Sequence, residues 1–319
     1  MLPQERLTDF GMAVTDDDTA MRLAAFAQVR RLSAMHDVLT HEHLKEGFTY
    51  QGERVPLVNP QRGIFKPRSM RHLLSVKTVF PKPGGRIWYD DQRQVHEQIY
   101  AGVEAIDYAF MGDNPDAADN RWLREAYENA IPIIYFLGIA PGRYQAILPV
   151  FLSGWDRQAL KAQLVVGDAQ GDTISVPSDG AERRYALRTV KQRLHQAQFR
   201  EAVLHAYGGR CALSNFPEGR LLDAAHIMND AHETMGQPVV QNGLPLSKLH
   251  HGAFDADLIG ISPDFVIHVS DRLMDQNDGP LLEAMKGLNR QSLHLPRRRS
   301  DWPDRERLEE RFARYRAAA

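Results

Sequence analysis

Four polar side chains stand close together in a mainly apolar stretch between residues 211 and 261. They are His226, Asn242, His251 and Asp255. A neutral imidazole is the usual general base near pH 7, and carboxylate and imidazole groups together bind divalent cations. Hydrolysis of a phosphodiester needs a base for the attacking water and a cation that stabilises charge on the leaving oxygen. The residue types therefore predict a metal-dependent nuclease centre.

Two short strands and a helix must position these groups. Apolar residues flank Asp223 and His226 throughout residues 221–227, after a turn sequence at residues 215–219, so this run is predicted to be a strand. Successive side chains of a strand point to opposite faces. Asp223 and Ala225 are therefore expected to share one face, with His226 on the other.

A second short strand is predicted at residues 239–240, with a turn at residues 242–243. Residues 246–254 are predicted to form a short helix. His251 and Asp255 are four positions apart, so they would lie on one face of this helix and could grip one ion. Each group alone has another explanation. His226 could be a core histidine, Asn242-Gly243 could be a simple turn, and His251 with Asp255 could be a solvated pair.

The motifs that carry these residues resemble the HNH endonuclease family, of the ββα-metal type. They read Leu-Asp-Ala-Ala-His226-Ile, Asn242-Gly-Leu-Pro-Leu and His251-Gly-Ala-Phe-Asp255. Sixteen positions separate His226 from Asn242, and nine separate Asn242 from His251. The resemblance implies that His226 is the general base, that Asn242 holds the loop that aims it, and that His251 and Asp255 bind metal.

The third metal ligand departs from the family pattern. Many relatives carry a metal-binding Asp or His directly before the base, where this chain has Ala225. Asp223, two residues earlier on the same predicted face, is the expected substitute. The resemblance implies Mg²⁺ or Mn²⁺ as the cofactor, with other transition metals as alternatives.

Cysteine usage limits structural metals. Many relatives brace this fold with zinc held by paired Cys-x-x-Cys motifs, but this chain has one cysteine, Cys211, with Ser214 in the partner place. A four-cysteine zinc site within one chain is therefore excluded. Cys211 is expected to be a buried apolar residue, and His250 and His232 are expected to be bystanders.

Composition sets the broad class. A length of 319 residues allows about two domains, and 43% hydrophobic with 25% charged residues is typical of a soluble protein. The single cysteine suits a reducing cytosol. The longest apolar run, residues 130–140, is too short to cross a bilayer, and the N-terminus has no apolar signal region. We expect a cytoplasmic bacterial protein. The net charge of −2 leaves DNA binding to local basic patches.

The N-terminal half is predicted to be a compact β-barrel. Helices are expected at residues 16–35 and 41–47 and near residues 120–129. A hairpin is expected at residues 48–58, with strands at residues 73–80, 88–91, 98–102, 131–137, 144–152 and 164–166. Many short strands with few helices are typical of a barrel.

Short words in residues 60–170 resemble the SET-and-RING-associated (SRA) module, a PUA-like barrel that flips a modified cytosine out of DNA. They are Tyr-Asp-Asp91, Ile-Tyr100-x-Gly, Asp119-Asn120 before a helix, and Gly142-x-Tyr144. A flipped base needs aromatic walls, which Trp88, Tyr89 and Tyr100 offer, and a polar edge, which Asp91 offers. The alternative is that these aromatic residues belong to the core and that the Asp pair marks a turn.

Basic residues suggest where DNA would lie. Lys66, Arg68 and Arg71 occupy a segment that Pro67 keeps from being helical, and Arg188, Lys191 and Arg200 lie on a long basic helix predicted at residues 182–207. The alternative for both sets is a solvated surface. The arginines at residues 297–299 are either a phosphate contact or a tail of little consequence.

We therefore expect an α+β protein. A PUA/SRA-like β-barrel with helices, residues 1–172, would select double-stranded DNA that carries 5-methylcytosine or 5-hydroxymethylcytosine. An HNH domain flanked by helices, residues 173–319, would cut it in modification-dependent restriction. One centre cuts one strand, so double-strand cleavage implies a homodimer or repeated action. The alternatives are an HNH nuclease that reads unmodified sequence or a phosphorothioate backbone, and a non-catalytic DNA-binding protein with a degenerate HNH fold.

Overall fold

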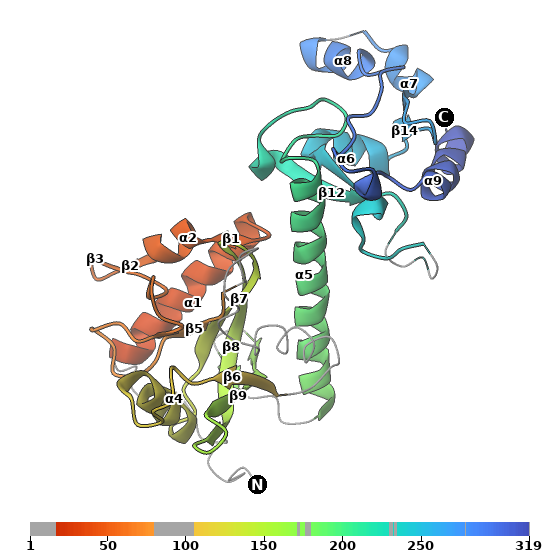
Figure 1. Ribbon diagram of the computed structural model, residues 1–319. Helices are drawn as coiled ribbons and strands as arrows, with labels where there is room; N and C mark the ends of the chain where they lie inside the picture. Colours follow the sequence, from red (N-terminus) through yellow and green to blue (C-terminus); the bar gives the residue numbers. More distant parts are fainter. Residues whose placement is uncertain are drawn as a thin grey trace. The chain divides into compact units, whose positions relative to one another are not determined.

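The computed structural model divides into two compact units, Met1–Leu194 and His195–Ala319 (Figure 1). It describes residues 17–79, 105–170, 173–175, 180–229, 232, 235–277 and 279–318. No helix within these ranges is long and apolar enough to span a membrane.

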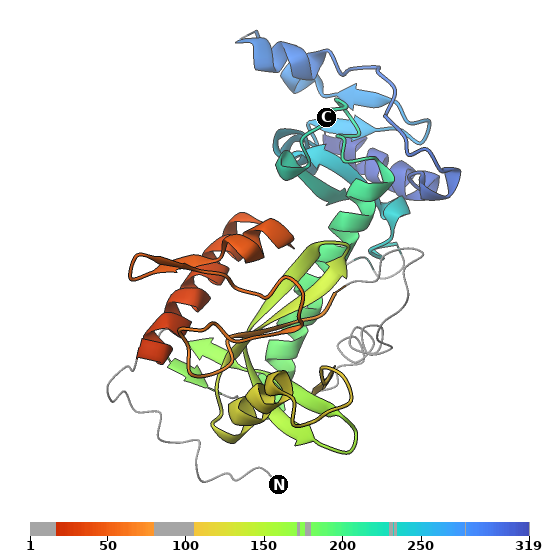
Figure 2. The same cartoon turned by 60° about the vertical axis from the view of Figure 1, so that its left-hand side comes forward.

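A mixed sheet of seven described strands forms the body of the first unit (Figure 2). The strand order is β4–β5–β7–β8–β9–β6, and β1 also pairs with β8. The bounds are β1 Leu39–Thr40, β4 Ile64–Phe65, β5 Ser75–Lys77, β6 Ile106–Ala109, β7 Ile133–Ala140, β8 Arg143–Asp156 and β9 Lys161–Val166. Up to Val150, β8 pairs with β7, and from Val150 onward it pairs with β9. This exchange of partners, with bulges in both ladders, curls the sheet.

Helices and a hairpin accompany the sheet. They are α1 (Asp17–Met35), α2 (His41–Glu46), α4 (Ala118–Glu128) and the hairpin of β2 (Phe48–Tyr50) and β3 (Glu53–Val55). The predictions of these elements are confirmed. Gly47 ends α2 with a φ of 66°, and a Cβ there would lie 2.0 Å from the carbonyl oxygen of Val55, so only glycine fits between the helix and the hairpin.

Several strand predictions in this unit need correction. The strand expected at residues 73–80 covers only β5, and β1, β4 and β6 were not expected. The polar stretch at residues 167–182 begins as a hairpin of β10 (Asp168–Gln170) and β11 (Thr173–Ser175). The short strands β1 and β4 pair with partners far away in the chain, so local periodicity cannot reveal them. The strands expected at residues 88–91 and 98–102 lie outside the described residues.

A strand–strand–helix motif forms the centre of the second unit. The helix α5 (Gly180–Ala206) leads into it and ends at Gly208 and Gly209, which have φ values of 65° and 71°. Strand β12 (Leu222–His226) pairs antiparallel with β13 (Gly243–Ser247), and α6 (Lys248–Asp255) follows. The remaining elements are β14 (Ile259–Ile261), β15 (Ile267–Val269), α7 (Asp271–Met274), α8 (Gly279–Lys286) and α9 (Arg305–Ala318).

The prediction of a strand at residues 239–240 was wrong. Val239 is 40% exposed, and a single 3-10 turn, Val240–Asn242, precedes the true strand β13. In β13, Leu244 and Leu246 are buried, whereas Pro245 is tolerated because it lies in a two-stranded sheet where each strand is an edge. The burial of Leu244 and Leu246, two positions apart, selects the strand. The strand propensity of Val239 and Val240, on which the prediction rested, does not report burial.

Candidate active site

The two faces of the β12–β13 hairpin carry different groups. Cross-strand partners share a face, and the register pairs Asp223 with Leu246 and His226 with Gly243. Asp223 lies on the face that meets α6, where His251 approaches it. His226 is three residues further on and lies on the opposite face, against α5. The structure thus agrees with the expected alternation of the strand.

The imidazole of His226 stacks on a phenyl ring from α5. The ring centroids of His226 and Phe199 are 4.0 Å apart, with 15° between the planes. A Cβ at Gly243 would lie 2.8 Å from the Phe199 ring and 2.3 Å from Val203, so glycine allows α5 to pack directly on the hairpin. The Nε2 atom of His226 is buried. The stacking therefore fixes the plane of the ring.

Asn242 joins the two ends of the polar loop between the strands. Its side chain is fully buried. The amide oxygen accepts a hydrogen bond of 2.9 Å from the N–H of Met228, and the amide nitrogen donates to the carbonyl oxygens of Met228 and Gln237, at 3.0 and 3.1 Å. Its own carbonyl oxygen accepts from the N–H of Ile227 over 2.9 Å. One side chain thus holds the backbone immediately after His226.

Asp223, His251 and Asp255 come together across β12 and α6, and we call them the carboxylate–imidazole cluster. The Nδ1 atom of His251 lies 3.6 Å from a carboxylate oxygen of Asp223, and Nε2 lies 3.3 Å from one of Asp255. The side chains of His251 and Asp223 are 27% and 28% exposed, whereas Asp255 is 65% exposed. Lys248 approaches Asp223 at 4.0 Å.

The donor atoms of this cluster fit a divalent cation, but only two of the three side chains can contact one ion in this arrangement. Carboxylate oxygen and imidazole nitrogen are suitable ligands for Mg²⁺, Mn²⁺ and Zn²⁺. The two carboxylates face opposite nitrogens of His251, so one ion can share His251 with Asp223 or with Asp255 in this arrangement. Within the described ranges, no group of three or more His, Cys, Asp or Glu side chains converges on one point.

Cys211 and His250 form a buried pair that the sequence reading missed. The sulfur of Cys211 lies 3.3 Å from Nδ1 of His250. Burial raises the pKa of the Cys211 thiol, but hydrogen bonds from His250 and Ser214 outweigh this effect and lower the pKa to about 6. Cys211 is therefore more than an apolar residue, and His250 is not a bystander. The matched spacings Cys211-x-x-Ser214 and Ser247-x-x-His250 were the available signal.

The predicted basic contacts of α5 differ in their surroundings. The guanidinium of Arg200 donates to the carbonyl oxygens of Gly219 and Leu222, at 3.1 and 2.9 Å, so it holds the chain where β12 begins. Arg188 is exposed, and Lys191 is half-buried. A DNA contact by these side chains stays a prediction.

The basic segment of the first unit has a fixed backbone. The ammonium of Lys66 donates to the carbonyl oxygen of Met70 over 2.8 Å and lies 5.5 Å from the centre of the Trp122 ring. Arg68 and Arg71 are exposed. Their contact with phosphates stays a prediction as well.

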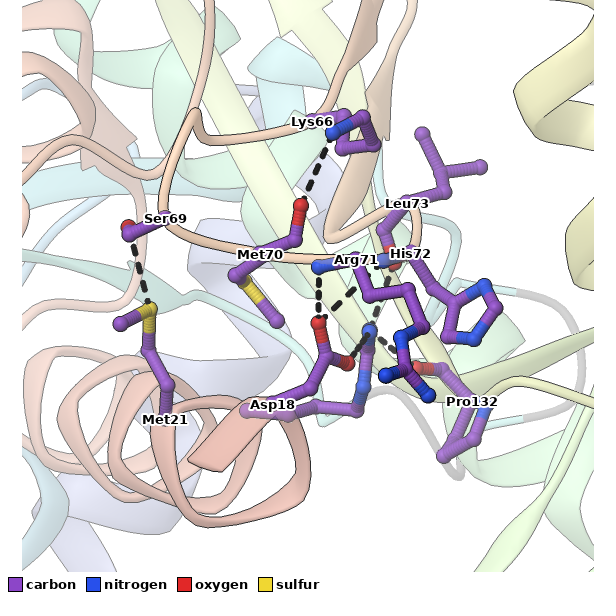
Figure 3. A network of polar contacts seen from close by, with 10 residues as sticks. Asp18, Met21, Lys66, Ser69, Met70, Arg71, His72, Leu73 and Pro132 are labelled. Atoms are coloured by element: carbon purple, nitrogen blue, oxygen red, sulfur yellow. Dashed lines mark hydrogen bonds and ion pairs between the residues drawn. The ribbon is translucent and has the colours of Figure 1, made fainter. Parts of the chain in front are cut away.

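Figure 3 shows what holds this segment on α1. A carboxylate oxygen of Asp18 accepts from the backbone N–H groups of Arg71 and His72. The other oxygen pairs at 3.0 Å with Arg22, which also donates to the carbonyl oxygen of Leu73. Because this network is largely buried, the exposed arginines project from a defined surface.

The predicted base-pocket residues Trp88, Tyr89, Asp91 and Tyr100 lie outside the described residues. The structure therefore leaves the modified-base pocket as a sequence-based prediction.

Comparison with known proteins defines the class of this site. Residues 211–262 match the HNH endonuclease family, and they contain the hairpin β12–β13 and α6. The chain thus carries an HNH endonuclease domain in its C-terminal unit, and the protein is a nuclease.

The comparisons of the whole chain are less specific. A solved structure titled "Modification dependent TagI restriction endonuclease" is similar over 80% of this chain and 86% of its own, with 14% sequence identity and a TM-score of 0.28. A TM-score this low supports no conclusion about fold or function. No curated protein matches the chain in sequence.

Proposed function

We propose that this protein is a DNA endonuclease that hydrolyses phosphodiester bonds with the help of a divalent cation. The observation that supports it is the carboxylate–imidazole cluster inside the segment that matches the HNH endonuclease family. The carboxylate–imidazole cluster and the strand-end His226, carried by one strand–strand–helix motif, provide the residue types for both requirements of phosphodiester hydrolysis.

Each residue has a distinct role in this proposal. His251 would hold the cation with Asp223 or Asp255, and the remaining carboxylate would orient the imidazole through its other nitrogen. When bound, the cation supplies charge stabilisation for the leaving oxygen. His226 would accept the proton of the attacking water at Nδ1, because Nε2 is buried. Asn242 would keep the backbone beside His226 in place.

We further propose that the N-terminal unit selects double-stranded DNA with a modified cytosine and that the biological role is restriction of modified foreign DNA in the bacterial cytoplasm. The support is the order of SRA-like words in residues 60–170. The proposed base pocket consists of Trp88, Tyr89, Asp91 and Tyr100, and the proposed domain boundary lies near residue 172. The curled sheet is compatible with a PUA-like barrel. The second candidate is a nuclease that reads another feature of DNA.

The test is cleavage of matched plasmids that carry cytosine, 5-methylcytosine or 5-hydroxymethylcytosine, with Mg²⁺ and Mn²⁺ tried separately. We expect cutting of modified plasmids only and a loss of at least about 100-fold in the rate with His226→Ala or His251→Ala. Groups that act on one phosphate are not additive, so the double variant should be little slower than either single variant.

The outcomes separate the parts of the proposal. Equal cutting of all three plasmids would retain the nuclease and reject recognition of modified cytosine. Cutting that survives both single substitutions would reject the assigned centre. Losses that multiply in the double variant would reject the assignment of His226 and His251 to one phosphate.

A further inference from the structure

Three consecutive exposed arginines stand at the tip of a closed loop in the second unit. They are Arg297, Arg298 and Arg299, and we call residues 296–302 the arginine loop. The indole N–H of Trp302 donates a hydrogen bond of 2.8 Å to the carbonyl oxygen of Pro296, which closes the loop. The guanidinium of Arg299 lies 5.4 Å from the centre of the Trp302 ring. These arginines therefore belong to a defined structure rather than to a loose tail.

The arginine loop is attached to the segment that leads into the active site. The side-chain amide of Gln241 donates to the carbonyl oxygen of Ser300, and the backbone carbonyl of Gln241 accepts from the N–H of Asp304 over 2.9 Å. Gln241 directly precedes Asn242, whose carbonyl oxygen accepts from the N–H that follows His226. One side-chain hydrogen bond to the loop and one main-chain hydrogen bond to Asp304, just after it, thus join this part of the chain to the residues around the proposed base.

A further contact holds the same part of the chain. Arg307, which follows the loop in α9, donates to the carbonyl oxygen of Met235 over 2.8 Å and to the side chain of Gln237 over 2.7 Å. The carbonyl oxygen of Gln237 in turn accepts from Asn242. The loop and the segment before β13 therefore form one connected substructure.

The arginine loop carries three arginines and one carboxylate, Asp301, so its net charge is positive. No ion pair joins Arg297 or Arg298 to an acidic side chain within the described part of the chain, and the nearby Asp304 pairs with Arg307 at 4.0 Å. The whole protein has a net charge of −2, so this cluster is not a consequence of a basic composition. Phosphate oxygens are the natural complement of unpaired guanidinium groups.

We propose that the arginine loop binds phosphates of the DNA strand next to the bond that is cut. This inference rests on the proposed function and adds a DNA contact surface to it. The position next to the cut bond is proposed because the loop is attached to Gln241, the residue before Asn242, and Asn242 holds the backbone that follows His226. Contacts of this kind position the strand and carry no sequence information themselves.

The test compares binding of short duplexes by Arg297→Gln/Arg298→Gln, in a His226→Ala background that prevents cutting. We expect the dissociation constant to rise on the order of 10-fold, and the slope of log affinity against log salt concentration to become shallower by about two, for duplexes with and without modified cytosine alike. In the otherwise unsubstituted enzyme, the same pair of substitutions should raise KM more than it lowers kcat.

Two controls accompany this experiment. Arg272→Gln/Arg290→Gln removes the same charge from exposed positions of the same unit, and Arg272 lies on α7, away from β12 in Figure 1. Arg297→Lys/Arg298→Lys keeps the charge and should restore the salt slope. Thermal unfolding of each variant checks that the fold is retained.

Equal effects of the Arg297/Arg298 and Arg272/Arg290 substitutions, or no effect of either, would overturn the assignment. Continued cleavage by the wild-type enzyme would then leave the proposed function intact. A wild-type protein that neither binds nor cuts any of the duplexes would overturn both.

Discussion

At the scale of single residues, the Cys211–His250 pair is a titratable contact inside the second unit. Two pairs of residues are each separated by two positions in the chain: Cys211 and Ser214, and Ser247 and His250. Cys211 is fully buried and contacts His250, and hydrogen bonds from His250 and Ser214 favour its thiolate over the thiol. The stability that this pair contributes therefore depends on pH.

We expect the contribution of Cys211 to stability to grow with pH. Its folded-state pKa of about 6 lies below the ordinary value of 9.0, so the stabilisation is absent below about pH 6 and complete above about pH 9. Urea unfolding should show that Cys211→Ala costs about 2 kcal/mol more at pH 9 than at pH 6.

The matched control is Leu213→Ala, which removes a neighbouring buried side chain with no titratable group. Its cost should be the same at both pH values. A Cys211→Ala cost that is equally independent of pH would show that the thiolate does not stabilise the fold.

At the scale of elements, α9 secures the end of α6 that carries the cluster. Arg311 donates to the carboxylate of Asp257 and to the carbonyl oxygen of Phe254, and its guanidinium lies 4.4 Å from the centre of the Phe254 ring. Arg314 donates to Asp257 and to the carbonyl oxygen of Asp255, both at 3.0 Å. Burial raises the pKa of the Asp257 carboxyl, but the two arginines outweigh it and hold this pKa below its usual range.

Arg311→Ala should destabilise the protein by about 2–3 kcal/mol, because it removes a buried guanidinium that pairs with Asp257 and packs on Phe254. Arg314 is 59% exposed, so Arg314→Ala should cost no more than about 1 kcal/mol. Urea unfolding measures both changes. Arg305→Ala breaks an exposed pair with Asp264 and serves as the control. An Arg311→Ala cost no larger than that of Arg305→Ala would show that α9 does not secure α6.

At the scale of the whole molecule, one HNH domain per chain limits how duplex DNA is cut. A single centre cleaves one strand, and a second cut needs another copy or another encounter. We expect nicked plasmid to accumulate before linear plasmid at low protein concentration, and linear product to form directly at high concentration.

A time course on agarose gels over a dilution series of the protein checks this expectation. His226→Ala, mixed in excess with the wild-type protein, is the matched control, because it should favour nicking over linearisation if two copies cooperate. Direct linearisation at every concentration would show that one chain cuts both strands.

The sequence by itself determined the class of the protein and named the candidate site residues. The order and spacing of His226, Asn242, His251 and Asp255 matched the family that residues 211–262 belong to. The proximity of His251 and Asp255 follows from periodicity, because a helical spacing of four is a local property, whereas the approach of Asp223 to His251 depends on how α6 packs on β12. The helices α1, α2 and α5 were predictable for the same reason.

Only the tertiary structure decided the contacts between segments that are distant in the chain. Phe199 on His226, the Cys211–His250 pair and the link from Gln241 to the arginine loop join residues between 27 and 59 positions apart. The true start of β13 at Gly243 likewise depends on what α5 and Asn242 pack against. Local patterns carry no record of such partners, because the free energy that selects them comes from burial and hydrogen bonding in the assembled core.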